Sequence, residues 1–238
     1  MRFRAASAND ISLANATSFA GRRMILIAGL GVFLAGPAQT YGVAVFVDPI
    51  LADFGWSRSV ISSAYAVGTL VGAGGVLLTG RLLDRFGHRR VLSVSALGFG
   101  GALVAMSRIT DPWTLALGFA LVRGFGIGAV LLASRTLVSQ WYVRRRGQAL
   151  SLVAVGGALS LALVPAANTF LITHLGWRTA WQLNALIIWL SLVPIATLFV
   201  RDRPEQVGQL PDGRTLTTNA DASTAIPLLE TAWHPRDA

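Results

Sequence analysis

The sequence contains no cysteine and no lysine, and only 13% of its 238 residues are charged. Without cysteine, the chain cannot form a disulfide framework, a thiolate metal site or a cysteine nucleophile. The low charge content, together with 53% hydrophobic residues and a mean hydropathy of +0.59, excludes a water-soluble globule. These absences indicate a protein of the lipid bilayer.

Apolar stretches long enough to cross a membrane follow one another along the chain. A spanning helix needs about 20 mostly apolar residues, because it rises about 1.5 Å per residue across about 30 Å of hydrocarbon. The sequence therefore predicts an all-α membrane protein: an N-terminal tail at 1–23, a six-span bundle at 24–200, and a disordered tail or linker at 201–238. The predicted spans are 24–47, 60–79, 91–106, 113–134, 149–173 and 180–200.

Every basic residue is an arginine, and the arginines flank the spans unevenly. Positive charge beside a span resists translocation, so the arginine-rich loops are expected in the cytoplasm. We therefore expect a multi-pass protein of the inner (plasma) membrane with both termini cytoplasmic. A net charge of +9 could suggest nucleic acid in a soluble protein, but these arginines lie between apolar runs, and no nucleic-acid partner is expected. The arginine-poor side holds Arg58, Arg108 and Arg178.

The most specific pattern lies between the second and third predicted spans. Two glycines, Gly80 and Gly87, permit a tight reversal of the chain, and a lone acid, Asp84, can accept charge-assisted hydrogen bonds or face a helix N-terminus. By composition alone, an ordinary arginine-rich loop in which Asp84 softens the repulsion is an equal alternative. The stretch reads Gly80-Arg81-Leu82-Leu83-Asp84-Arg85-Phe86-Gly87-His88-Arg89-Arg90.

The order Gly-x-x-x-Asp-Arg-x-Gly-x-Arg-Arg resembles the signature loop of the major facilitator superfamily. This family consists of secondary transporters built from two six-span halves, each a 3+3 inverted repeat. The resemblance covers residues 24–205 and implies an N-terminal half whose gating residues are Gly80, Asp84, Arg85, Gly87, Arg89 and Arg90. Residues 123–128 and 141–147 are similar to further motifs of the family, and residues 54–59 and 203–208 to its oxalate/formate antiporter and monocarboxylate porter branches.

Arg123 is the one charged residue inside a predicted span. A charged arginine at mid-bilayer costs about 2.5–3.5 kcal/mol, so it requires a partner or a water-filled cavity. No acid lies in the predicted spans, and a carboxylate substrate could supply the counter-charge to the planar guanidinium. The alternatives are a role in gating or proton coupling, or bonds to helix carbonyls or to a missing half.

Other polar side chains at membrane depth extend this hypothesis. Gln39, Tyr41 and Tyr65 are candidate substrate contacts beside Arg123. Asn168 and Asn184 are expected instead to hydrogen-bond between helices.

The function expected is secondary transport of small organic anions, such as mono- or dicarboxylates, with proton coupling as one option. The chain ends in the linker that precedes a second half, so we expect it to need a missing C-terminal six-helix half or a second copy. One alternative is a carrier of other solutes or drugs that works as a dimer of halves.

A more distant alternative is a six-span intramembrane enzyme. A serine protease would need a buried serine within reach of a histidine. The single Gly-x-Ser pattern, at 55–57, lies in an outer loop, and His88, His174 and His234 are interpreted as solvated loop or tail residues. We therefore expect no catalytic activity, no cofactor and no metal.

Overall fold

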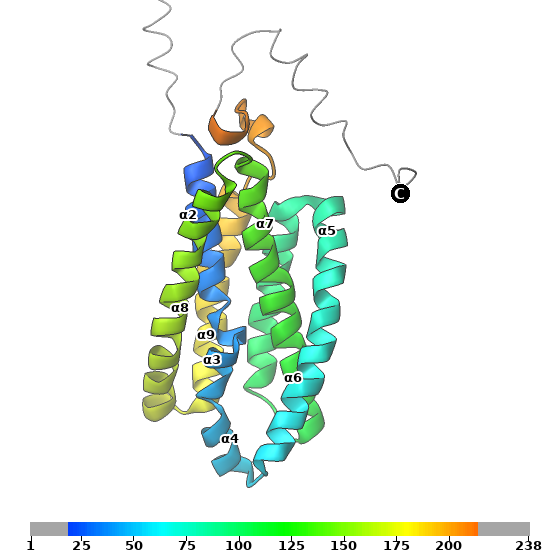
Figure 1. The fold of residues 1–238 in the computed structure, drawn as a ribbon. Coiled ribbons are helices and arrows are strands. Elements are labelled where there is room, and N and C mark those ends of the chain that lie inside the picture. Colours follow the sequence, from blue (N-terminus) through cyan, green and yellow to red (C-terminus); the bar gives the residue numbers. More distant parts are fainter. Residues whose placement is uncertain (1–18, 214–238) are drawn as a thin grey trace, which may run out of the picture.

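The computed structural model describes residues 19–213, which form a bundle of long helices lying side by side. The described chain begins and ends at the same end of the bundle (Figure 1). We call this the terminal end and the other the distal end. In chain order, the elements are α2 (Gly21–Leu34), η1 (Gly36–Ala38), α3 (Thr40–Ala44), α4 (Val47–Phe54), α5 (Arg58–Met106), α6 (Pro112–Arg123), η2 (Gly124–Leu131), α7 (Leu132–Trp141), α8 (Arg146–Leu175), α9 (Trp177–Phe199), η3 (Pro204–Val207) and η4 (Pro211–Gly213).

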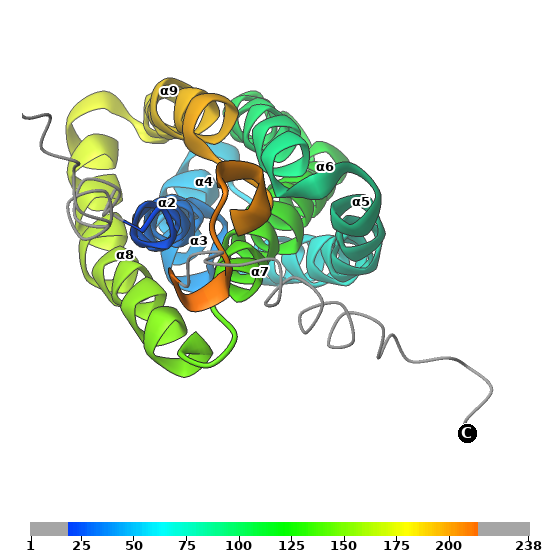
Figure 2. The ribbon, with the colours of Figure 1, turned by 90° about the horizontal axis from the view of Figure 1, so that it is seen from above.

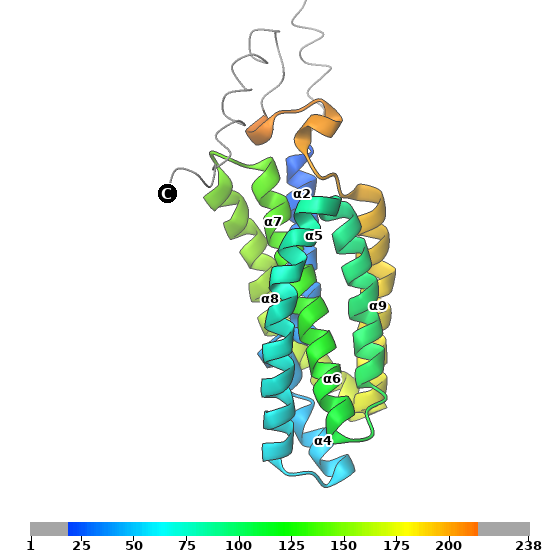
Figure 3. The ribbon, with the colours of Figure 1, turned by 90° about the vertical axis from the view of Figure 1, so that its right-hand side faces the viewer.

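The prediction of six passes is confirmed within the described residues. Helices long and apolar enough to span a membrane cover Gly21–Ala44, Arg58–Met106, Pro112–Trp141, Arg146–Leu175 and Trp177–Phe199. One of them, α5, supplies two passes, because its chain reverses at Gly87 and forms a hairpin of two antiparallel arms (Figures 1 and 3). The fold is therefore an all-α membrane bundle.

The reversal in α5 depends on one glycine instead of the two expected. Gly87 has φ 80° and ψ 166°, a region that is open essentially to glycine alone, and it is the one residue of α5 with non-helical angles. Gly80 continues the helix and has open space around its α-carbon. The expectation that Gly80 also takes part in the turn is wrong, because the first arm continues past it as regular helix.

The first pass is interrupted near its middle. Proline lacks a backbone N–H, and around Pro37 the α-helix gives way to the 3-10 turn η1. Gln39 is extended, with φ −74° and ψ 157°, before the chain resumes as α3. The interruption places backbone carbonyls and the polar residues 39–41 at membrane depth.

Small residues let the passes approach closely, as helix packing within lipid requires. A β-carbon on Gly156 of α8 would clash with the carbonyl oxygen of Gly29 in α2. A β-carbon on Gly68 of α5 would lie 2.5 Å from Cβ of Phe119 in α6. Between α8 and α9, buried Asn184 donates from Nδ2 to Oδ1 of Asn168 at 2.8 Å, which confirms the predicted interhelical bond.

Residues 201–213 pack on the terminal end of the bundle, where we had expected a disordered segment. Asp212 accepts hydrogen bonds from the backbone N–H groups of Arg144 at 2.9 Å and Arg145 at 3.2 Å. Burial works to raise the pKa of Asp212, but these N–H donors outweigh it and hold the pKa below its ordinary value. Of the expected tails at 1–23 and 201–238, residues 1–18 and 214–238 lie outside the described residues.

Replacing Gly87 with alanine is expected to destabilise the chain. The new β-carbon would meet the carboxylate of Asp202 at 2.8 Å, and the positive φ alone costs about 1–3 kcal/mol. Thermal unfolding in detergent, followed by circular dichroism, should show a lower midpoint.

The matched control is Gly80→Ala, which adds the same methyl group in open space within a helix. It should leave the midpoint unchanged or raise it, because alanine is favoured over glycine in helices by about 0.5–1 kcal/mol. Equal losses in the two variants would contradict the assignment of the turn to Gly87.

Candidate functional site

Arg123, at the end of α6, lies where the first, second and fourth passes meet. Its Nη1 donates to the hydroxyl of Tyr65 in α5 and, at 3.4 Å, to the carbonyl oxygen of Ala38 in η1. The guanidinium carbon also lies 4.7 Å from the centre of the Tyr65 ring, a cation–π contact. Tyr65 in turn shares a hydrogen bond of 2.9 Å with Thr40. The predicted pair Arg123 and Tyr65 is therefore in direct contact.

The partners of Arg123 among residues 19–213 are neutral. The ion pairs of this part of the chain are Arg58 with Asp48 and Arg178 with Asp53, both at the distal end. Arg123 uses Nη1 alone in its hydrogen bonds to described residues, so Nε and Nη2 are available to a ligand. The site thus keeps a positive charge with free donors.

The helix that carries Arg123 changes its winding immediately after this residue. Residues 124–131 form the π-helix η2, and regular α-helix resumes as α7. Such segments are rare and occur frequently at functional sites. Four small residues, Gly124, Gly126, Gly128 and Ala129, allow this wide turn to lie close to its neighbours.

Gln39 and Tyr41 belong to a separate hollow of about 550 Å³ between the first pass, α7 and α8. Its lining is apolar apart from these two residues and Arg135. Tyr41 donates from its hydroxyl to Ser160 at 2.9 Å, and Ser160 donates to the carbonyl of Phe33 at 2.9 Å. The four predicted substrate contacts therefore form two groups, Arg123 with Tyr65 and Gln39 with Tyr41.

Arg135 is a residue that the sequence interpretation missed, because it was placed in a loop just past the fourth span. The structure continues that pass to Trp141, so Arg135 stands within a helix and faces the hollow that contains Gln39. The apolar residues Leu137 and Val138, both fully buried, continue the hydrophobic pattern beyond Arg135 and were the available signal.

The predicted gating residues lie at the turn of the α5 hairpin. Arg89 is held by two bonds, from its backbone N–H to Asp202 at 2.7 Å and from Nε to the carbonyl of Thr197 at 2.8 Å. Asp84, Arg85 and Arg90 are exposed. Within residues 19–213, Asp84 has no ion-pair partner.

One interpretation near this turn is wrong. His88 is buried, with 7% of its surface exposed, and it shares a hydrogen bond of 3.1 Å with Thr136 of α7. It is not a solvated loop residue, because the second arm of α5 starts beside it and packs it against the fourth pass.

Comparison with known proteins identifies the fold. The chain is 33% identical over 190 residues to the puromycin resistance protein pur8 of Streptomyces alboniger, a match that covers 77% of this chain and 36% of that protein. It is 33% identical over 153 residues to the 4-hydroxybenzoate transporter PcaK of Acinetobacter baylyi, with 62% of this chain and 32% of the transporter covered. The chain thus spans about a third of the length of these curated relatives.

A solved structure, the inward-open xylose transporter XylE from E. coli, matches with a TM-score of 0.62 at 19% identity, over 90% of this chain and 57% of that one. At this identity the likeness concerns the fold. A sequence profile described as the Major Facilitator Superfamily matches residues 24–236. Since that match covers most of the sequence and the bundle has the corresponding fold, the chain belongs to the Major Facilitator Superfamily.

Proposed function

We propose that this six-helix bundle is one half of a secondary transporter for small organic anions, such as mono- or dicarboxylates. Family membership makes the protein a transporter and rules out the intramembrane enzyme considered above. The observation that carries the anion proposal is Arg123, a half-buried cation whose partners among the described residues are all neutral.

The energetics of Arg123 favour an anionic ligand. A charged arginine at membrane depth costs about 2.5–3.5 kcal/mol, which hydrogen bonds to Tyr65 and Ala38 offset in part without neutralising the charge. A carboxylate on Nε and Nη2 would form charge-assisted bonds, which are roughly twice as strong as neutral ones. Tyr65 then orients the guanidinium, while Gln39, Tyr41 and Arg135 contact the ligand in the neighbouring hollow.

The relatives support this proposal and also its alternative. One of them is named for 4-hydroxybenzoate, a small aromatic carboxylate, and another for resistance to puromycin. A carrier of drugs or other solutes is therefore the second candidate, and the charge requirement at Arg123 distinguishes the two.

The transport cycle in this proposal requires a second bundle, because alternating access rocks two bundles about a shared site. The chain covers 57% of the solved relative, so the second bundle is either a C-terminal six-helix half or another copy of this chain. Residues 201–238 are then the linker. Gly80, Asp84, Arg85, Gly87, Arg89 and Arg90 act in the change of state, with Asp84 available to the second bundle.

The anion proposal predicts that charge decides binding. The purified chain in nanodiscs should bind labelled 4-hydroxybenzoate and reject its uncharged methyl ester. Arg123→Gln should weaken binding of the acid by at least about tenfold, since hydrogen bonds to charged groups contribute about 1.5–3 kcal/mol. Scintillation proximity binding measures both ligands.

The control is Arg108→Gln, which removes an exposed arginine from the distal end and should leave binding unchanged. Equal binding of the acid and the ester, or no effect of Arg123→Gln, would overturn the anion proposal. Binding of puromycin in that case would favour the drug carrier.

In the proposed orientation, the terminal end of the bundle lies on the cytoplasmic side of the inner membrane. Because the sequence has no cysteine, one introduced thiol can be assigned without ambiguity. In intact cells, a membrane-impermeant maleimide should label Ser57→Cys at the distal end and spare Gln148→Cys at the terminal end, both of which are exposed positions.

After permeabilisation both variants should be labelled, which controls for reactivity. Labelling of Gln148→Cys in intact cells, with Ser57→Cys protected, would mean the opposite orientation.

A further inference from the structure

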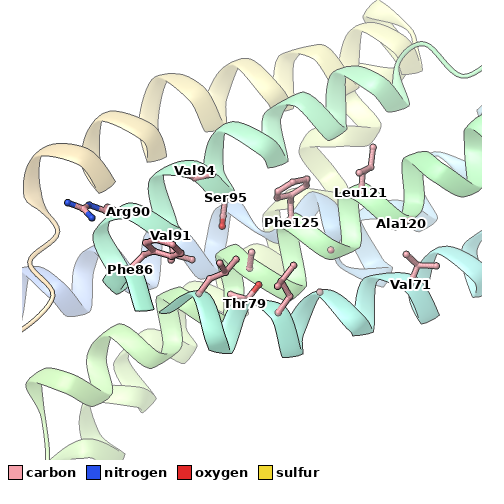
Figure 4. Close-up of a pocket in the computed structure, with 15 residues that line it drawn as sticks. Val71, Thr79, Phe86, Arg90, Val91, Val94, Ser95, Ala120, Leu121 and Phe125 are labelled. Carbon is pink, nitrogen blue, oxygen red and sulfur yellow. The ribbon is translucent and has the colours of Figure 1, made fainter. Parts of the chain in front are cut away.

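A groove separate from the Arg123 site runs along the α5 hairpin. It has a volume of about 530 Å³, within the range of about 300–1,000 Å³ typical of small-ligand sites. Its walls are the two arms of α5, residues 71–86 and 90–95, and its floor is residues 120–129 of α6 and η2. Figure 3 shows these arms on either side of the fourth pass, and Figure 4 shows the side chains that line the space between them. We call it the hairpin groove.

The hairpin groove opens toward the outside of the bundle. Val71, Leu78 and Val94, which line it, have 60%, 57% and 65% of their surfaces exposed. On the outer side of a membrane bundle, apolar surface of this kind is suited to contact with lipid chains. The groove can therefore be entered sideways from the bilayer.

The residues that line the hairpin groove change from charged to polar to apolar along its length, starting from the terminal end. Arg90 stands at the terminal end, three residues after the turn at Gly87 (Figure 4). It forms no ion pair within residues 19–213. The guanidinium is thus free to bind an anion at the level of the membrane surface.

A second polar level lies deeper in the groove. Thr79 and Ser95 are each eight residues from Gly87 on opposite arms, and both are buried, with 4% and 6% of their surfaces exposed. Ser95 lies about 7.5 Å along the helix from Arg90, at about 1.5 Å per residue. Figure 4 shows both hydroxyls at the groove.

Beyond these hydroxyls the hairpin groove is lined by apolar residues. From Thr79 to Val71 the first arm rises about 12 Å, which is close to the roughly 15 Å of hydrocarbon in one leaflet. Along the groove, a cation is followed by hydroxyl donors and then by an apolar channel. A phospholipid presents its phosphate, ester carbonyls and acyl chain in the same spatial order.

We propose that the hairpin groove binds one anionic phospholipid from the leaflet at the terminal end. Its phosphate lies on Arg90, its ester carbonyls accept from Thr79 and Ser95, and one acyl chain fills the apolar channel. An anionic headgroup is favoured over a zwitterionic one because Arg81 and Arg85 also stand at this end, against the single acid Asp84 on the hairpin. The proposal is independent of the transported substrate.

Native mass spectrometry of the full 238-residue chain provides the test. The chain is purified in detergent and titrated with dioleoylphosphatidylglycerol or with dioleoylphosphatidylcholine, which has the same acyl chains. We expect one tightly held phosphatidylglycerol per chain and weaker retention of phosphatidylcholine.

Two variants separate the parts of the site. Arg90→Gln should weaken phosphatidylglycerol binding by about fivefold, the contribution of one arginine near an anionic surface, and should barely change phosphatidylcholine binding. Val94→Trp should fill the groove from an exposed position and reduce retention of both lipids. Circular dichroism verifies that each variant keeps its helix content.

The matched controls are Arg146→Gln and Val155→Trp on α8, which lies on the other side of the bundle from the hairpin (Figure 2). Both positions are exposed, and both variants should bind lipid as the parent chain does. Equal losses in the controls, equal retention of the two lipids, or full binding by Val94→Trp would overturn the proposal. So would a photo-crosslinker at position 94 in membranes that captures protein instead of lipid.

Discussion

Hydrocarbon offers no hydrogen bonds, so each polar group inside the membrane must find its partner within the protein, and Arg123 shows how this requirement shapes the fold. A continuous first pass would keep its carbonyls within its own helix. The interruption at Pro37 instead leaves the carbonyl of Ala38 within reach of the Arg123 guanidinium. Two features that are each unfavourable in lipid, a broken helix and a half-buried cation, thus partly satisfy one another.

Close backbone packing is the second condition for this arrangement. A β-carbon on Gly72 would lie 2.9 Å from Cβ of Arg123, so the second and fourth passes touch at the residue that carries the charge. Tyr65 stands seven residues earlier, two helical turns away on the same face, and this brings its hydroxyl and ring to the guanidinium. A larger residue at position 72 would separate the donor from its acceptor, which ties a packing glycine directly to the electrostatics of the site.

Much of the fold could be predicted from the sequence, since long apolar runs and the placement of arginines report directly on the requirements of lipid. The expectation that Asn168 and Asn184 hydrogen-bond between helices came from the usual role of asparagine in membrane bundles, and the structure shows that they bond to each other. The sequence did not predict how the polar residues are grouped. Gln39 and Tyr65 lie in different groups because of the way their helices are rotated, and the pattern of residue types does not determine that rotation. Arg135 and His88 were misplaced for a related reason. Charge was taken to mark the end of a helix, whereas the helices extend past both residues, to Trp141 in the one case and up to the turn at Gly87 in the other.

The π-helical segment η2 also fixes the phase between the two arginines of the fourth pass. A π turn holds one more residue than an α turn, so the portions of the pass before and after residues 124–131 are out of register with a single continuous α-helix. Deleting one residue in this segment would let it relax to regular α-helix, and Arg123 and Arg135 would keep nearly the same faces, because the wide turn is what absorbs the extra residue. The wide turn therefore lets the fourth pass hold one additional residue without rotating Arg135 relative to Arg123.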